Sequence, residues 1–133
     1  MSERTLTPYA NSLGIIFEGE EDGAPVLALD FDNMVEGRPG HLHGGAISGL
    51  LETAGYELLR TTLMNSGRVR QLKPINITMQ FLAGGKQRRT YAKGRITKLG
   101  RRNANIAVEA WQDDRDRPIA TAIMNILMAE IDQ

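Results

Sequence analysis

Two kinds of hydrophobic spacing along the chain predict where helices and strands lie. Across residues 44–60 the apolar side chains recur every three or four positions, the spacing of a helix. They are Ala46, Ile47, Leu50, Leu51, Ala54, Leu58 and Leu59. This stripe is wide, so we expect the helix to be covered on most sides. Residues 7–13 predict a short helix, because Thr7 suits its cap, Pro8 its first position and Gly14 its end.

Apolar runs with strand spacing occupy most of the remaining sequence. In residues 75–81 the odd positions are apolar and the even ones polar, which indicates a half-buried strand. Residues 119–131 are apolar on both faces, so we expect a central strand that is covered on both sides. The AGGK segment at residues 83–86 is expected to be a hairpin turn. Further predicted strands are residues 15–18, 26–31, 90–99 and 103–112, and residues 33–42 are predicted to be a loop.

The order of these elements indicates an α+β fold. A short helix and two strands precede the long helix, and four strands follow it. An antiparallel sheet with its bulk of helix on one face is the α+β arrangement, and a curved sheet wrapped around the one long helix is the economical way to pack it. The length of 133 residues suits one domain, residues 1–133.

Composition removes several classes of chemistry. The chain has no cysteine, which excludes disulfides, zinc–thiolate sites and a cysteine nucleophile. Its two histidines, His41 and His43, give little basis for a metal site, and we expect none. No apolar run approaches the roughly 20 residues that span a bilayer, and the first residues lack a signal-peptide core. We therefore expect a cytoplasmic protein with no membrane partner.

The net charge is zero, but the charges are unevenly distributed. No acidic residue occurs between Leu58 and Val108, and this window holds twelve of the sixteen basic residues. A block of one sign indicates either a partner of opposite charge, such as a phosphorylated small molecule or a nucleic acid, or a solvated basic face. The low aromatic content, 5%, argues against a nucleic-acid partner, because no strand reads as a stacking platform.

The segment around residues 40–56 carries the candidate chemistry. Gly44 and Gly45 stand where the loop becomes the long helix. The first backbone N–H groups of a helix have no internal partner and lie at the positive end of its dipole. Without side chains to screen these donors, a carbonyl oxygen or an anion can approach closely. The geometry is that of an oxyanion site, where one donor is worth roughly 3 kcal/mol to a transition state.

Glu52 is the second candidate group. It lies in the middle of the helix, on one face with Ser48 and Tyr56, each four residues away. A carboxylate beside an apolar stripe can activate water as a base or attack an acyl carbon as a nucleophile. The alternative is an ordinary solvated glutamate. Glu57, just over one turn further on, is expected to be a surface charge.

The two histidines and Ser48 are the other polar residues of this segment that could take part in chemistry. A histidine beside a helix start can be an acid/base group, but for His43 we favour a role in fixing the loop by hydrogen bonds. His41 has the same two alternatives. No nucleophile elbow precedes Ser48, so a Ser-His-Asp triad finds no support in this chain.

Taken together, the motif His43-Gly44-Gly45, the apolar helix, an acid seven positions after the second glycine and the four strands that follow resemble the hotdog-fold acyl-CoA thioesterases. The group that includes the phenylacetate-degradation thioesterase is the most similar. The resemblance implies a helix wrapped by a sheet and a homodimer in which two sheets join edge to edge. Tetramers built from two such dimers are common in the family. It further implies that Gly44 donates its N–H to the thioester carbonyl and that Glu52 is the base or nucleophile. Coenzyme A is then part of the substrate, and no cofactor is expected.

The distance along the helix supports a site shared between subunits. Gly44 and Glu52 are eight residues apart, roughly 12 Å along a helix axis. One carbonyl cannot lie about 3 Å from both groups, so a joint action requires two chains. The sequence also departs from the family, which often has Asn or Gln six residues before the motif histidine. Gly37 stands there, and Asn33 is the nearest polar candidate.

Substrate contacts are the least determined part. The basic window suggests four arginines near turns as ligands of CoA phosphates, namely Arg88, Arg89, Arg101 and Arg102. Candidates for the rest of the pocket are Asn33, Ser48, Tyr56, Met79 and Phe81, of which the apolar ones can equally belong to the core. Two alternatives to hydrolysis stay open: a non-catalytic acyl-CoA-binding protein and a hydroxyacyl-thioester dehydratase.

Overall fold

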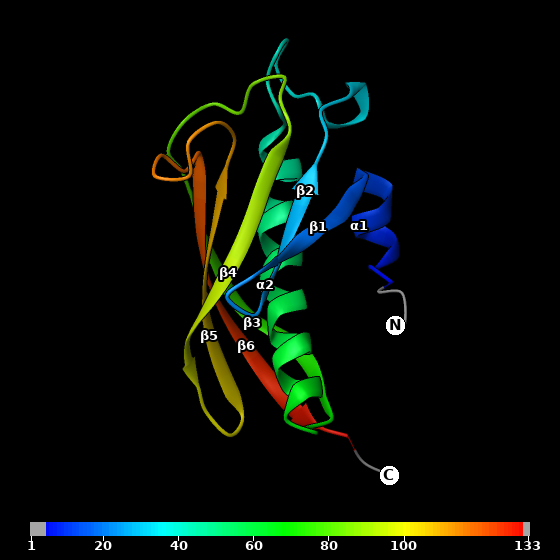
Figure 1. The fold of residues 1–133 in the computed structure, drawn as a ribbon, viewed down its shortest axis with the longest axis vertical. Helices are drawn as coiled ribbons and strands as arrows, with labels where there is room; N and C mark the ends of the chain where they lie inside the picture. Colours follow the sequence, from blue (N-terminus) through cyan, green and yellow to red (C-terminus); the bar gives the residue numbers. More distant parts are fainter. Residues whose placement is uncertain (1–4, 132–133) are drawn as a thin grey trace.

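A computed structural model of the chain describes residues 5–131 and contains two α-helices, a short 3-10 helix and six strands within that range (Figure 1). The elements are α1 (Pro8–Leu13), β1 (Ile15–Glu21), β2 (Ala24–Leu29), the 3-10 helix η1 (Asn33–Val35), α2 (Gly44–Asn65), β3 (Arg70–Phe81), β4 (Thr90–Leu99), β5 (Asn103–Trp111) and β6 (Ala120–Glu130).

The six strands form one antiparallel sheet in the order β1-β2-β4-β5-β6-β3. The sheet curves around α2, and α1 packs on the side of α2 near β1 (Figure 1). The core lies between the inner face of the sheet and α2, where Leu50, Leu51 and Leu59 have no exposed surface. The expected hotdog architecture, one long helix wrapped by a curved antiparallel sheet, is confirmed.

Two glycines allow α2 to approach the sheet closely. A Cβ added at Gly55 would collide with Met124 Sδ of β6. A Cβ added at Gly94 of β4 would lie 3.1 Å from Leu58 Cδ2 and 3.6 Å from the Gly55 Cα. The helix and the middle of the sheet thus meet with little more than backbone between them, which is the dense packing that a wrapped helix requires.

Several local predictions from the sequence are confirmed. Thr7 caps α1, since its Oγ1 accepts from the Ala10 N–H at 3.2 Å, and Gly14 ends it with a left-handed φ of 80°.

Two other elements are longer than predicted. The long helix extends to Asn65 instead of residue 60, and Leu63 in its last turn is buried. The strand predicted at residues 75–81 starts earlier, at Arg70.

The predicted hairpin turn at residues 83–86 is wrong. β3 pairs with β6, whereas β4 lies between β2 and β5, so the segment crosses from the edge of the sheet to its middle. Neighbours in sequence often pair, but β4 already has a partner on each side. Gly84 and Gly85 are needed for a different reason: an added Cβ would lie 3.2 Å from the His41 ring in one case and 3.0 Å from Leu42 Cδ1 in the other.

Two expectations about burial also need correction. β6 lies inside the sheet as expected, but within this chain only its inner face is covered, and Ile123 on the outer face is 59% exposed. Glu57 is not a surface charge: it is 6% exposed and forms an ion pair with Arg60. A buried carboxylate needs such a partner because burial removes its hydration.

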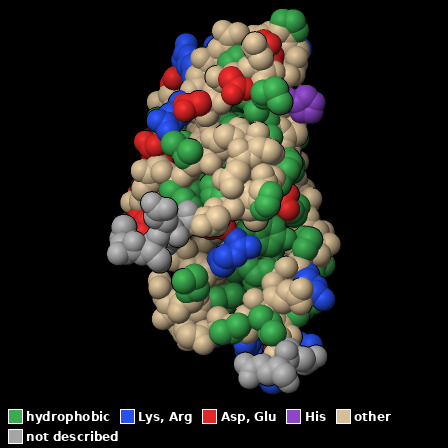
Figure 2. Space-filling model, turned by 90° about the vertical axis from the view of Figure 1, so that its right-hand side faces the viewer, with side chains coloured by type: hydrophobic (Ala, Val, Ile, Leu, Met, Phe, Trp, Pro, Cys, Tyr) green, Lys and Arg blue, Asp and Glu red, His purple; other side chains and the backbone are tan. Residues whose placement is uncertain are grey.

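The edge strand β3 has apolar side chains exposed on and beside it. Exposed fractions are 54% for Ile75, 55% for Phe81 and 57% for Leu82, and Val69 just before the strand is 66% exposed. Hydrophobic side chains are visible over the length of the molecule on the side seen in Figure 2. A long unpaired strand with apolar flanks favours pairing with another chain. Among the described residues, no helix is both long and apolar enough to cross a membrane.

We predict that Gly55→Val destabilises the fold by about 2–3 kcal/mol, because the added side chain overpacks the contact with Met124. Met124→Ala alone leaves a cavity and costs about 2–5 kcal/mol. The double variant should lose clearly less than the sum of the two, since the smaller residue makes room for the larger. Urea unfolding of the three variants measures this, and simple additivity would contradict the assigned contact.

Candidate active site

The loop before α2 is held on both sides by backbone hydrogen bonds. The His43 N–H donates to the Val35 carbonyl at 2.8 Å, which ties η1 to the start of the helix. The Leu42 N–H donates to the Gly85 carbonyl at 2.8 Å, which ties the loop to the crossover between β3 and β4. Glu36 closes the loop tip by accepting from the Gly40 N–H at 2.8 Å. The start of α2 is therefore fixed by the nearby η1 and by the crossover segment, which is distant in sequence.

His43 is the N-cap of α2 and accepts hydrogen bonds from three N–H groups of the first helical turn. Its ring Nδ1 accepts from the Gly45 N–H at 2.8 Å. Its carbonyl accepts from the N–H groups of Ala46, at 2.9 Å, and Ile47, at 3.2 Å. The structural role that we favoured for this histidine agrees with these contacts. Gly45, by contrast, has no open donor, because its N–H is already engaged.

Gly44 provides the remaining donor. Its N–H has no hydrogen-bond acceptor among residues 5–131, and the residue is exposed. It borders a groove of about 320 Å³ whose wall includes Phe81, the side chain that an added Cβ at Gly44 would contact at 3.7 Å. Ser48, one turn on, donates its hydroxyl to the Gly44 carbonyl at 2.9 Å. A free backbone N–H at a helix start, beside an apolar wall, is suited to polarising a carbonyl.

Glu52 and Tyr56 lie further along the same helix, away from the loop. Glu52 is half-buried, and so is Tyr56, whose hydroxyl oxygen is buried without a hydrogen-bond partner among the described residues. Burial, followed by the nearby Glu52 carboxylate, raises the pKa of Tyr56 above its ordinary value, while Arg60 acts in the opposite direction. The two side chains are thus close enough to interact, and Tyr56 keeps its proton at neutral pH.

The other pocket candidates divide between surface and core. Asn33 is exposed in η1, two residues from the Val35 carbonyl that holds His43. Met79 is half-buried and packs against the hydrophobic core. At Gly37, where the family often has Asn or Gln, a side chain would be crowded: an added Cβ would lie 3.0 Å from the His43 Cα.

The four candidate arginines lie in two distant places, and two of them are already neutralised. Arg88 forms an ion pair with Asp113, and Arg89 lies 3.2 Å from Glu18 and 3.4 Å from Asp30. Arg101 and Arg102 follow β4, in the turn near the far end of α2, and line a hollow of about 350 Å³ with Glu130. That turn lies at the opposite end of the molecule from the start of α2 (Figure 1).

Sequence reasoning missed the parts of this site that depend on long-range contacts. Arg38 lines the groove at Gly44 together with His41, which the sequence had singled out, and Gly85 holds Leu42, but no local pattern connects these segments. The signal that was available is the pair Gly84-Gly85, which marks a close approach of backbone. Within residues 5–131, no group of three or more His, Cys, Asp or Glu side chains is arranged to hold a metal ion.

Fold and site together define a hotdog protein with an open backbone N–H donor at the start of its central helix. A family model described as the thioesterase superfamily matches residues 39–119, more than half of the chain. The chain belongs to this superfamily, and the family predicted from the His43-Gly44-Gly45 motif is confirmed. No curated protein matches the sequence.

Solved structures agree with this assignment. A protein of Chromobacterium violaceum is 30% identical, with a TM-score of 0.72 over 94% of this chain and 85% of the other. A phenylacetic acid degradation-related protein of Ralstonia eutropha is 20% identical, with a TM-score of 0.78 over 93% and 92% of the two chains. A variant of the phenylacetic acid degradation protein PaaI of Thermus thermophilus is 20% identical, with a TM-score of 0.77 over 92% and 99%. At these identities the last two show a shared fold.

We predict that His43→Ala lowers the free energy of unfolding by about 1 kcal/mol, because the Gly45 N–H loses its acceptor. His43→Asn should keep most of the stability, since an asparagine oxygen can cap the same N–H. Urea unfolding of both variants measures the difference. Equal losses in the two variants would show that the histidine ring stabilises the protein by packing and not by capping.

Proposed function

We propose that this protein hydrolyses acyl-CoA thioesters to the free acid and coenzyme A. The Gly44 N–H polarises the thioester carbonyl, and Glu52 of a second chain removes a proton from water as its oxygen attacks the acyl carbon. The carbon–sulfur bond then breaks, and the departing thiolate takes up the proton held by Glu52. Direct attack by the Glu52 carboxylate, followed by hydrolysis of the anhydride, gives the same products. Water is the only co-substrate, so no cofactor is required.

The single observation that carries the proposal is that the Gly44 N–H has no acceptor among the described residues, whereas the neighbouring N–H groups at the start of α2 all have one. A donor left open at the positive end of a 22-residue helix is suited to an oxygen on which negative charge develops. Membership of the thioesterase superfamily supports hydrolysis of a thioester in general. CoA as the thiol and Glu52 as the base are the parts that experiment must test.

The same geometry defines how two chains must meet. If Glu52 of one chain is level with Gly44 of the other, two antiparallel α2 helices are related by an axis midway between these positions. That midpoint is Ser48, about 6 Å along the helix from Gly44. A homodimer built this way has two equivalent sites, each with Gly44 from one chain and Glu52 from its partner.

The edge strand β3 supports such a dimer. Its outer edge has no partner strand among residues 5–131, and its last residue, Phe81, lies next to Gly44. Pairing of two β3 strands would join the two sheets and cover exposed apolar side chains such as Ile75. Pairing of two dimers into a tetramer stays a prediction from the family resemblance.

A non-catalytic acyl-CoA-binding protein is the second candidate. It is favoured by Gly37, because glycine provides no side chain to hold the attacking water where the family often has Asn or Gln, and the close His43 Cα would crowd one. Release of free thiol from acyl-CoA separates the two candidates, since a binding protein produces none.

We predict that Glu52→Gln lowers kcat for acyl-CoA hydrolysis by about 10²–10⁴-fold, because the amide cannot accept the proton of the attacking water. The measurement is thiol release from aryl- and fatty-acyl-CoA esters. Glu57→Gln is the matched control, with the same change on the same helix at a residue paired with Arg60. It should keep kcat near the native value in protein that is shown to be folded. Full activity of Glu52→Gln would remove Glu52 from the mechanism.

The position along α2 at which the dimer axis crosses can be tested by crosslinking. Because the chain has no cysteine, each introduced cysteine is the only reactive thiol. We predict that Ser48→Cys gives covalent dimers with a short bis-maleimide reagent, since the two copies face each other at the axis. Met64→Cys, exposed at the far end of α2, should stay uncrosslinked. Denaturing electrophoresis measures the yield. Efficient crosslinking only at position 64 would place the axis too far from Gly44 for the shared site.

A further inference from the structure

The groove at Gly44 continues past His41 to a second hollow. The groove of about 320 Å³ is lined by Arg38, His41, Gly44 and Phe81, among others. The second hollow, about 470 Å³, is lined by His41, Lys86 and their neighbours. Both are bounded by His41, so they adjoin there. Together they form a path from the free Gly44 donor to the surface between two loops.

Glycine backbone forms one wall of this path. An added Cβ at Gly84 would lie 3.2 Å from the His41 ring and 3.4 Å from Arg38 Nη2. The Arg38 and His41 side chains therefore lie directly over the crossover segment, at the opening of the groove. An alanine at position 84 would crowd both side chains, so the glycine lets the Arg38 guanidinium lie against the backbone of the crossover segment.

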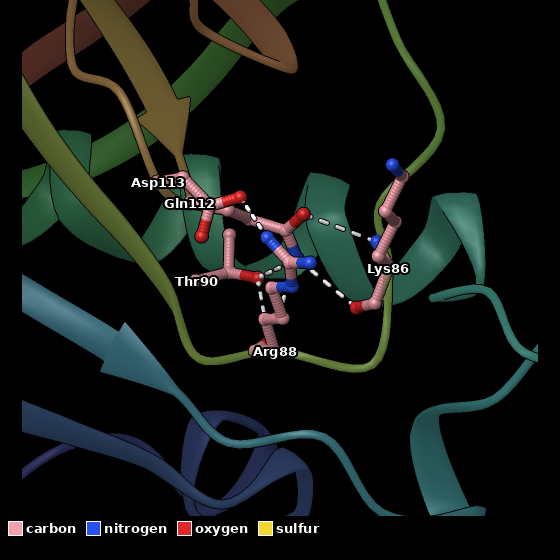
Figure 3. A network of polar contacts seen from close by, with 5 residues as sticks. All are labelled: Lys86, Arg88, Thr90, Gln112 and Asp113. Atoms are coloured by element: carbon pink, nitrogen blue, oxygen red, sulfur yellow. Dashed lines mark hydrogen bonds and ion pairs between the residues drawn. The ribbon is translucent and has the colours of Figure 1, made fainter.

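A side-chain clamp fixes the other end of the path. The Lys86 N–H donates to Gln112 Oε1 at 3.1 Å, and Gln112 Nε2 donates to the Lys86 carbonyl at 3.0 Å. Gln112 Nε2 also donates to Thr90 Oγ1 at 3.1 Å. Figure 3 shows these contacts with the Lys86 side chain pointing away from them. The backbone of Lys86 is held on both sides, while its ammonium group stays available.

Ion pairing separates the cations near this path into two groups. Arg88 is paired with Asp113, and Arg89 lies within ion-pair distance of Glu18 and Asp30. Arg38 and Lys86, both exposed, form no ion pair with any described residue. These two are therefore the cations with charge to offer a ligand that enters at the groove.

We propose that Arg38 and Lys86 bind the phosphate groups of a phosphopantetheine thioester whose carbonyl lies at Gly44. The inference rests on the proposed thioester hydrolysis and assigns the thiol side of its substrate to these two loops. A guanidinium can bind a phosphate through two parallel hydrogen bonds, and an ammonium group adds a point charge. The uncharged pantetheine arm suits the stretch between Gly44 and the cations, which presents glycine backbone and apolar side chains.

The test compares two thioesters of the same acyl group, one on coenzyme A and one on N-acetylcysteamine, which has no phosphate. Arg38→Glu and Lys86→Glu should each raise KM for the CoA ester about tenfold or more and change kcat little. Neither should alter kinetics with the N-acetylcysteamine ester. Lys98→Glu, the same reversal of charge at an exposed lysine of β4 outside the groove, is the control and should leave KM for both esters unchanged.

Three results would overturn the inference: equal effects on both esters, no effect on the CoA ester, or a KM for the CoA ester that rises as much in the Lys98 variant as in the other two. Salt gives a second measurement on the native protein. KM for the CoA ester should rise with ionic strength, and KM for the N-acetylcysteamine ester should not. A salt response that is the same for both esters would also count against a phosphate site.

The phosphate-free ester keeps this inference separate from the proposed function. If the native protein hydrolyses neither ester, the thioesterase proposal fails. If it hydrolyses both and the charge variants have no effect, only the phosphate site fails. Phosphopantetheine is found both in coenzyme A and attached to carrier proteins, so an acylated carrier protein is tested as the second possible substrate. Faster turnover of that substrate, with the same loss in both variants, would support the site and identify a carrier-bound thioester as its ligand.

Discussion

The close contact between α2 and the curved sheet is the constraint on which the rest of the structure depends. Gly55 and Gly94 let the helix approach β4 and β6 until backbone nearly meets backbone. The sheet can then wrap the helix, and three leucines of α2 lose all solvent contact. This packing fixes the axis of α2 and therefore the direction of its dipole and the position of its first residue. A loosely packed helix would not hold the open Gly44 N–H in one place.

The start of α2 also shows why one donor stays open. A helix begins with four backbone N–H groups that lack partners. Here the His43 N–H bonds to the Val35 carbonyl, the Gly45 N–H to the His43 ring and the Ala46 N–H to the His43 carbonyl. Gly44 is left, and its missing side chain and exposed position keep the donor accessible. The histidine thus contributes by occupying the donors that would otherwise compete for a ligand, which leaves a single point of attachment.

The sequence predicted the features that depend on local spacing. The short helix with its Thr7 cap, the long helix and the strands follow from periodicity and capping residues, and the His43-Gly44-Gly45 motif led to the correct family. The wrong or missing parts depend on contacts between distant segments. The crossover at residues 83–86 resembles a hairpin locally, and only the pairing of β4 with β2 and β5 shows otherwise. The burial of Glu57 likewise depends on what covers that face of α2, which spacing cannot show.

The cations of the basic window differ in whether an acidic side chain already neutralises them. Arg88, Arg89 and Lys93 are paired with acids from β1, the turn after it and the segments around β2 and β5, so they link parts of the sheet. Charges used in this way have little left to offer a ligand, because a second anion would have to displace the first. Lys86 of this window, and Arg38 outside it, form no ion pair among the described residues. A count of basic residues therefore overstates the surface available to an anion, and the distribution of acids decides where that surface lies.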